Sequence, residues 1–285
     1  MFDRILVPVD GSACSQVAVQ YATELATRYG ASVHALCVAD SRTLENAPHR
    51  DQIEHECAEI AADACKHIAA SPVSAERAVR TGVPHRAILR YATERGIDLV
   101  VMGSHGRTGV DRYLLGSVTE RVVRLSDVPV LTVKAADDGG ITYPYTDILV
   151  PTDGSACAEA AIDPAVDIAR AYDARLHALS VVETVSMGVD IGSAEVFDAL
   201  EASARSAVET VETRAEQASV PAIETAVLHG TPYRGIRSYV EDHDVGLVAM
   251  GTHGRTGVGR YLLGSVTERT VRTSPVPVLT VRADT

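Results

Sequence analysis

The chain has 285 residues, of which 46% are apolar and 22% are charged, a globular composition with enough residues for one large core or two of domain size. This composition excludes a disordered chain, a collagen and a coiled coil. The formal charge of −12 argues against a broad basic surface, so we expect no nucleic-acid partner.

An internal repeat organises the sequence. Residues 7–14, VPVDGSAC, recur at 150–157 as VPTDGSAC with an offset of 143. Residues 103–109, GSHGRTG, recur at 251–257 as GTHGRTG with an offset of 148. A period this long indicates duplicated domains and not a solenoid. With a polar, breaker-rich segment between the copies, we expect a first domain over 1–135, a linker over 136–145 and a second domain over 146–285.

Each copy alternates strands and helices. In the first copy, residues 5–9 form an apolar strand that ends at Asp10, and a helix with an apolar face from Val17 to Ala26 follows. The later elements are, in order, a strand over 33–38, a helix over 53–69, an extended segment over 75–79, a helix over 84–95, a strand over 99–102, a short helix that contains Val118 and Val122, and a strand over 128–133. Strands without polar alternation are covered on both faces. We therefore expect two repeated, Rossmann-like α/β domains, each a parallel sheet with helices on both faces.

The second copy departs from the first at Pro164, which stands where the first copy has Tyr21. Proline removes a helical hydrogen bond and its ring clashes with the preceding turn. We expect a bent helix at this point, or one that restarts after Asp163.

The most distinctive spacing is Gly-x2-Gly-x9-Gly-Ser, which starts at Gly103 and recurs from Gly251. The segment follows a strand and precedes a helix, so its backbone N–H groups and the positive helix end can converge on an anion. Charge-assisted hydrogen bonds contribute about 1.5–3 kcal/mol each, so a few of them hold a polyphosphate. Arg107 and Arg255 add positive charge. The pattern predicts a phosphate-binding loop in each copy.

A purely structural interpretation of the same residues stays open. Residues 117–120 and 265–268 both read Ser-Val-Thr-Glu, the pattern of a capping box, in which each serine only terminates its helix. Asp10 and Asp153 precede Gly-Ser at a strand-to-helix turn, where an aspartate can form a structural Asx turn.

The five cysteines do not suggest a disulfide framework. They are odd in number and contain no Cys-x-x-Cys pair: Cys14, Cys37, Cys57, Cys65 and Cys157. A disulfide scaffold is therefore not expected. A zinc site on His55, Cys57, Cys65 and His67 is not expected either, because residues two apart in a helix point about 200° away from each other.

The sequence also bears on the compartment. It has no apolar run of about 18 residues, and Met1 to Arg4 lead directly into Ile5 without the apolar stretch of a signal peptide. We expect a soluble, cytoplasmic protein with no membrane partner. Only two of the 26 basic residues are lysines, Lys66 and Lys134. The preference for arginine over lysine, together with the excess of acidic residues, gives the hypothesis of a salt-adapted, halophilic cytoplasm.

Three elements together resemble the universal stress protein family: the segment 8–12, PVDGS, the glycine spacing, and the segment 128–133, VPVLTV. The resemblance covers 2–133 and again 146–281, with the three elements in order both times. It implies a five-stranded parallel sheet of order 3-2-1-4-5 in each copy, and a nucleotide-binding type that holds ATP or a related nucleotide such as ADP or AMP. The site would lie where the strand order reverses, between the first and fourth strands.

The resemblance also implies roles by position. Asp10 and Asp153 would face the ribose and a phosphate bridged by Mg²⁺, and Val38 would offer its backbone to the adenine edge. The site in the first copy would comprise Pro8, Val9, Asp10, Val38, Met102, Gly103, Gly106, Arg107, Gly116, Ser117 and Val118. The site in the second copy would comprise Pro151, Thr152, Asp153, Val181, Met250, Gly251, Gly254, Arg255, Gly264, Ser265 and Val266.

Two functions follow from these features. The sequence lacks the motifs of three other protein classes. It has no Walker A motif of a motor NTPase, no Gly-x-Gly-x-x-Gly of a Rossmann dehydrogenase after the first strand, and no Gly-x-Ser-x-Gly nucleophile elbow of an α/β-hydrolase. The first function is an ATP-binding regulator or sensor in the stress response. The alternative is a slow Mg²⁺-dependent ATP hydrolase. His105 and His253 have no partner fixed by nearby sequence and no dedicated base is visible, so we favour binding and expect no catalytic residue.

The final strands bear on assembly. In the family that this chain resembles, the last strand lies at the sheet edge and pairs with its equivalent. An uncovered edge at 128–133 or 276–281 invites aggregation. The resemblance thus implies an intramolecular pseudo-dimer of the two domains, with a homodimer of chains as a further step.

Overall fold

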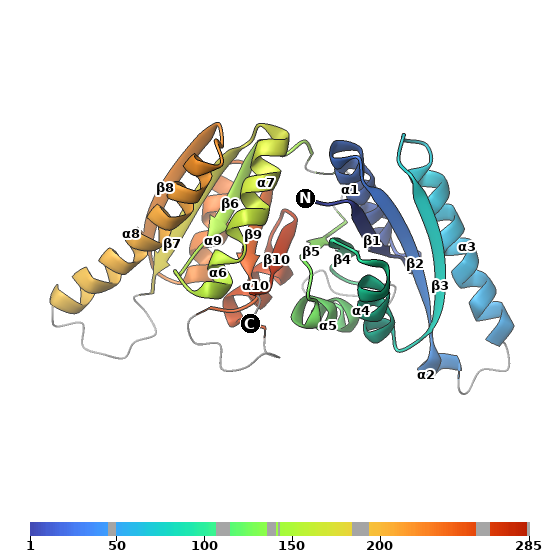
Figure 1. Cartoon of the computed structure of the whole chain (residues 1–285). Helices are drawn as coiled ribbons and strands as arrows, with labels where there is room; N and C mark the ends of the chain where they lie inside the picture. The colour runs from blue at the N-terminus through green and yellow to red at the C-terminus, as the bar shows by residue number, and fades with distance from the viewer. Residues whose placement is uncertain are drawn as a thin grey trace. The chain divides into compact units, whose positions relative to one another are not determined.

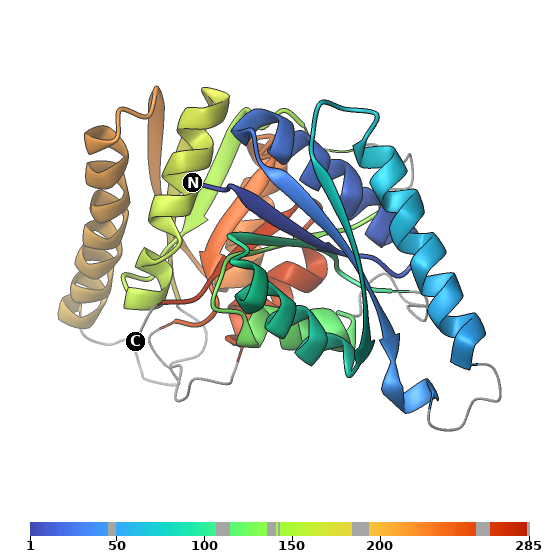
Figure 2. The same cartoon turned by 45° about the vertical axis from the view of Figure 1, so that its right-hand side comes forward.

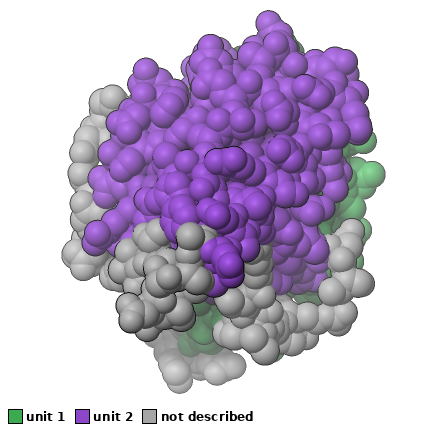
Figure 3. Space-filling model, turned by 90° about the vertical axis from the view of Figure 1, so that its left-hand side faces the viewer, with its two compact units in different colours: residues 1–141 green, residues 142–285 purple. Residues whose placement is uncertain are grey.

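The chain divides into two compact units, residues 1–141 and 142–285 (Figures 1 and 3). The computed structural model describes residues 1–44, 50–106, 115–135, 141, 143–183, 194–254 and 263–283. The expected linker over 136–145 therefore lies partly outside the described residues. Within the described part, no helix is both long and apolar enough to cross a bilayer.

Unit 1 is a five-stranded parallel sheet with helices between the strands. Its elements are β1 (Arg4–Pro8), α1 (Ala13–Tyr29), β2 (Ser32–Asp40), α2 (Ser41–Leu44), α3 (Arg50–Ile68), β3 (Ala75–Gly82), α4 (Pro84–Arg95), β4 (Leu99–Gly103), α5 (Ser117–Leu125) and β5 (Val130–Val133). The strand order is β3-β2-β1-β4-β5, with every described pairing parallel. The expected order 3-2-1-4-5 is confirmed.

Unit 2 repeats this arrangement. Its elements are β6 (Asp147–Pro151), α6 (Ala156–Glu159), α7 (Ile162–Tyr172), β7 (Arg175–Val182), α8 (Ala194–Gln217), β8 (Ala222–His229), α9 (Pro232–Asp242), β9 (Leu247–Gly251), α10 (Ser265–Thr273) and β10 (Val278–Val281). The order β8-β7-β6-β9-β10 is that of unit 1.

Helices cover both faces of each sheet. In unit 1, α1 and α3 pack on one face and α4 and α5 on the other (Figure 2). Residues 5–7 of β1 and 99–101 of β4 are at most 1% exposed, which explains why these strands show no polar alternation. Because parallel strands end at one edge, the loops after β1 and β4 meet there, on either side of the point where the order reverses.

Two local expectations need correction. The helix after β6 is interrupted: α6 ends at Glu159 and α7 begins at Ile162, so the expected restart comes before Asp163 and not after it. Ala160 and Ala161 keep right-handed helical dihedrals, and the ring of Pro164 excludes the helical hydrogen bond to the carbonyl of Ala160. The last strand of unit 1 begins at Val130 and not at residue 128. Ser126 Oγ accepts a hydrogen bond from Val128 N–H and donates one to the Val128 carbonyl, which forms a tight turn. Pro129 has no N–H to donate to a neighbouring strand.

A buried histidine at the opposite edge of unit 1 gives a prediction about stability. His34 of β2 lies 3.0 Å from the Tyr91 hydroxyl and 3.7 Å from Glu76. Burial lowers the pKa of His34; Glu76 opposes this effect, while Arg95 and Arg4 add to it. Between the ordinary value of 6.5 and the lower pKa of the folded state, only the unfolded chain binds the proton. Stability is therefore present above pH 6.5 and is lost as the pH falls below it.

We expect the urea midpoint of the wild type to fall between pH 7.5 and 5.5, about one unit to either side of the His reference pKa, and to fall less in His34→Gln. The exposed His55 provides a matched control, since its side chain is 73% exposed. His55→Gln should behave as the wild type. Equal pH dependence in all three proteins would contradict this role of His34.

Candidate functional site

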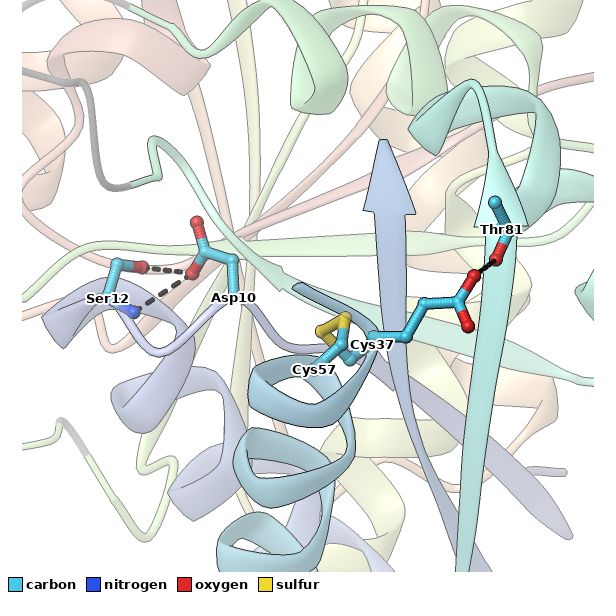
Figure 4. Close-up of a disulfide and its surroundings, with 6 residues drawn as sticks. Asp10, Ser12, Cys37, Cys57 and Thr81 are labelled. Atoms are coloured by element: carbon cyan, nitrogen blue, oxygen red, sulfur yellow. Dashed lines mark hydrogen bonds between the residues drawn. A yellow bond between two sulfur atoms is a disulfide. The ribbon is translucent and has the colours of Figure 1, made fainter. Parts of the chain in front are cut away.

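The turn between the first strand and first helix of each unit is built around an aspartate. Asp10 Oδ1 accepts hydrogen bonds from Ser12 N at 3.0 Å and Ser12 Oγ at 2.6 Å (Figure 4). Asp153 Oδ1 accepts in the same way from Ser155 N at 3.0 Å. The structural Asx turn is therefore present in both units, and it uses one oxygen of each carboxylate.

The other carboxylate oxygen faces the glycine loop. A Cβ added to Gly106 would clash with Asp10 Oδ2, and one added to Gly254 would clash with Asp153 Oδ2. The loop backbone thus passes directly beside the carboxylate in each unit. An Asx turn and an orientation toward the loop are compatible, because they use different oxygens of the same group.

The two flanking glycines also permit close backbone approach. A Cβ on Gly103 would lie 2.7 Å from Cys14 Cβ, and one on Gly251 would clash with the carbonyl of Cys157. Gly116 N–H donates to Ser104 O at 2.8 Å, and Gly264 N–H does so to Thr252 O at 2.8 Å. The glycine spacing therefore folds the loop back onto the end of the strand that it follows.

The capping-box interpretation of the serines is wrong. The N-caps of α5 and α10 are Gly116 and Gly264, so Ser117 and Ser265 are the first helical residues, and both side chains are exposed. The neighbouring threonines fasten the helices instead, since Thr119 and Thr267 each donate to the carbonyl of the strand-end glycine at 2.8 Å.

Unit 2 has a cavity of about 640 Å³ at the carboxyl edge of its sheet. Ten residues predicted for the second site line it: Pro151, Thr152, Asp153, Val181, Met250, Gly251, Gly254, Gly264, Ser265 and Val266. Side chains that the sequence did not single out complete the wall, among them Leu200 and Ala204 of α8 and Ile236 of α9. The binding role of these residues stays a prediction, as does that of Arg255, which lies outside the described residues.

The equivalent residues of unit 1 lie at the same edge of their sheet. Pro8 pairs with Leu36 in register, and Val9 N–H donates to Leu36 O at 2.8 Å, so Asp10 follows the end of β1 beside Val38. Met102 and Gly103 end β4, and Gly116, Ser117 and Val118 begin α5. Arg107 lies outside the described residues.

Sequence reasoning missed a pairing of cysteine with histidine in each unit. Cys14 Sγ lies 3.4 Å from His105 Nε2, and Cys157 Sγ lies 2.9 Å from His253 Nε2. The partner of each histidine comes from the start of the first helix, more than 90 residues earlier in the chain. Only the repeated Cys and His at matching positions hinted at this contact.

A disulfide joins Cys37 and Cys57, whose Cα atoms are 5.5 Å apart, whereas no disulfide framework was expected. The two cysteines are separated by 20 residues, and they meet because α3 folds back over β2. Cys57 therefore cannot serve the zinc site considered above. Cys14, Cys65 and Cys157 remain thiols.

The sequence matches the model of a known family. The model of the Universal stress protein family matches residues 1–134 and again 144–282. The chain belongs to the universal stress protein family. It is a tandem member, because the family domain occurs twice.

Relatives of this universal stress protein include single-domain and tandem chains. Universal stress protein MJ0531 of Methanocaldococcus jannaschii is 38% identical over 141 residues, which cover 47% of this chain and 83% of that protein. Universal stress protein Rv2005c of Mycobacterium tuberculosis is 31% identical over 295 aligned positions, 98% of this chain and 96% of that protein. A universal stress protein from Archaeoglobus fulgidus shares the fold, with a TM-score of 0.76, 24% identity and coverage of 99% of this chain and 98% of that one.

Proposed function

We propose that each unit binds one adenine nucleotide, ATP or its relatives ADP and AMP, and that nucleotide occupancy makes the protein a regulator or sensor in the stress response. The observation that supports this proposal is the unit 2 cavity, which gathers ten residues from distant segments that the family resemblance had assigned to one ligand. Its volume of about 640 Å³ falls within the usual range of small-molecule sites, about 300–1,000 Å³.

The lining of the cavity combines two kinds of surface, as a nucleotide requires. Val181, Ile236 and Met250 offer apolar surface suited to a purine ring. Gly264 and Ser265 offer backbone and a hydroxyl at the N-terminus of α10, where the helix dipole favours anions. The adenine would contact the apolar residues and the phosphates the N-terminus of α10.

Mg²⁺ and the two loop arginines belong to the same proposal. A carboxylate oxygen is a ligand that Mg²⁺ prefers, and Mg²⁺ commonly binds through one carboxylate together with substrate phosphates. Asp10 and Asp153 each direct one oxygen toward the glycine loop, so they fit this use. Arg107 and Arg255 would neutralise the remaining phosphate charge.

Regulation would work through the stabilisation of the occupied form. A ligand that binds only the folded state stabilises it by about 2.7 kcal/mol at a hundredfold excess over its dissociation constant. The resemblance also implies that the last strands of the two units, β5 and β10, pair with their equivalents. The proposal therefore extends to an intramolecular pseudo-dimer and a homodimer of cytoplasmic chains. We also propose that the protein is adapted to high salt. A protein that keeps its fold and its affinity for the nucleotide equally well without salt and in molar salt would contradict this proposal.

Calorimetric titration with ATP and Mg²⁺ tests the proposal, and it should give two sites per chain. The alternative function, slow hydrolysis, is separated by following phosphate release under excess ATP and Mg²⁺. We expect intact ATP to be recovered after binding. Turnover that disappears in the double variant Asp10→Ala, Asp153→Ala would establish the hydrolase instead, and an absence of binding heat would reject both.

A further inference from the structure

The Cys37–Cys57 disulfide adjoins Val38, a residue of the candidate site of unit 1. Cys37 stands directly before Val38, the residue expected at the adenine edge, and one position beyond the Leu36 that pairs with the end of β1. The bond ties β2 to α3 (Figure 4). Both cysteines are at most 5% exposed, so the bridge is part of the packed interior and not a surface staple.

Unit 2 shows what the same positions do without a bridge. Cys37 corresponds to Ser180 at the repeat offset of 143. The pattern of buried residues in α3 recurs in α8 at a constant offset of 147. Cys57 therefore corresponds to Ala204. The matching buried positions are 57, 61, 64 and 68 in α3 and 204, 208, 211 and 215 in α8. Ser180 and Ala204 both line the unit 2 cavity. The bridge of unit 1 therefore occupies the place of two cavity-lining side chains.

The fold does not require this bond. Unit 2 has the same strand order, and its α8 contacts β7 and β8 as α3 contacts β2 and β3, with Ser180 and Ala204 in place of the cysteines. A covalent tie in one copy only, at the wall of a site that both copies share, points to a difference in binding and not in architecture.

We propose that Cys37 and Cys57 are a reversible thiol–disulfide site that sets the nucleotide affinity of unit 1 and leaves unit 2 unchanged. This inference rests on the proposed function. The oxidant is a low-molecular-weight disulfide. One protein thiolate attacks it, forms a mixed disulfide and releases one small thiol; the second protein thiolate then attacks the mixed disulfide and releases the other. The protein loses two electrons and two protons, which leave with the two small thiols.

The bridged form binds more tightly because its wall is already ordered. In the reduced form, the N-terminal half of α3 is held to the sheet by non-covalent contacts such as the hydrogen bond from Thr81 Oγ1 to Glu54 Oε1, which is long at 3.4 Å and exposed. Binding must then order that wall, and ordering side chains reduces affinity. We expect the oxidised unit 1 to bind ATP about three- to tenfold more tightly.

The coupling is reciprocal, which supplies a second readout. A nucleotide that prefers the bridged form must stabilise the disulfide by the same factor. The residues at the equivalent positions line the cavity in unit 2. ATP should therefore shift the thiol–disulfide equilibrium of the unit 1 bridge toward the disulfide.

The test uses the full chain with Gly254→Val, which blocks the unit 2 site and leaves unit 1 to be titrated. ATP with Mg²⁺ is titrated into protein oxidised by oxidised glutathione and into protein reduced by a phosphine. The matched control adds Cys37→Ser and Cys57→Ala, which gives unit 1 the residues of unit 2. That control keeps Cys14, Cys65 and Cys157, so any redox response that it retains belongs to those thiols.

We expect tighter binding after oxidation in the parent, and in the control an affinity equal to that of the reduced parent under both conditions. Equal affinities of oxidised and reduced parent, or an equal redox response in the control, would overturn the inference and leave the proposed function standing. Wild-type protein that binds no ATP in either redox state would overturn both. A thiol–disulfide equilibrium in a glutathione redox buffer that is the same with and without saturating ATP would also reject the coupling.

Discussion

Gly254→Val is expected to remove one of the two nucleotide sites. A Cβ at this position already clashes with Asp153 Oδ2, and the Asx turn to Ser155 restrains that carboxylate from turning away. Valine must therefore displace the loop from the edge of the sheet. Overpacking of this kind costs about 1–3 kcal/mol, so we expect the affinity of unit 2 to fall by up to about a hundredfold.

The duplicated architecture supplies the control. Gly106→Val should act on unit 1 in the same way, because Gly106 lies against Asp10 Oδ2. Calorimetric stoichiometry should fall from two sites to one in each single variant and to zero in the double variant, with circular dichroism unchanged. Two remaining sites in either single variant would show that the glycine loop does not hold the ligand.

Asp153→Ala and Asp153→Asn are expected to separate the two roles of the carboxylate. Alanine removes the hydrogen bond from Ser155 N–H as well as the charge, so the free energy of unfolding should fall by about 0.5–1.5 kcal/mol. Asparagine keeps an acceptor for the turn and removes only the charge. Its stability should equal that of the wild type, whereas the gain in ATP affinity from Mg²⁺ at unit 2 should disappear.

These measurements are made with unit 1 blocked by Gly106→Val, so that the titration reports unit 2 alone. Urea unfolding gives the stability, and titration of ATP with and without Mg²⁺ gives the metal dependence. An asparagine variant that keeps the full Mg²⁺ effect would contradict a role of the Asp153 carboxylate in binding Mg²⁺. Asp10 should respond in the same way in unit 1, because its Oδ1 makes the equivalent turn with Ser12.

The fold could be predicted because its signals are local or repeated. The apolar run at 5–9 marked β1 to within one residue, and the duplicated segments identified both units. The break at Pro164 also follows from the chemistry of one residue, although its position depends on which carbonyl the ring meets. The glycine loop could be placed because it follows one strand and precedes a helix at the edge where the parallel strands end. The family resemblance named the other residues of the candidate site.

The remaining features depend on contacts between distant segments. Nothing in the sequence around Cys57 indicates that α3 folds back to place it against Cys37, and the pairings of Cys14 with His105 and Cys157 with His253 join residues more than 90 positions apart. The serines at 117 and 265 fit a capping box by spacing alone. Gly116 and Gly264 cap the helices instead, and the N–H of each is hydrogen-bonded to a carbonyl at the end of the preceding strand. This contact between separate segments is not contained in a local pattern.

A crystal structure of the protein grown with ATP and Mg²⁺ tests the central claim most directly. The account predicts density for one nucleotide in each unit, with the purine between Val181 and Ile236 in unit 2 and the phosphates against Gly254 and Ser265. Empty cavities at saturating ATP, or a nucleotide bound away from the glycine loops, would contradict it.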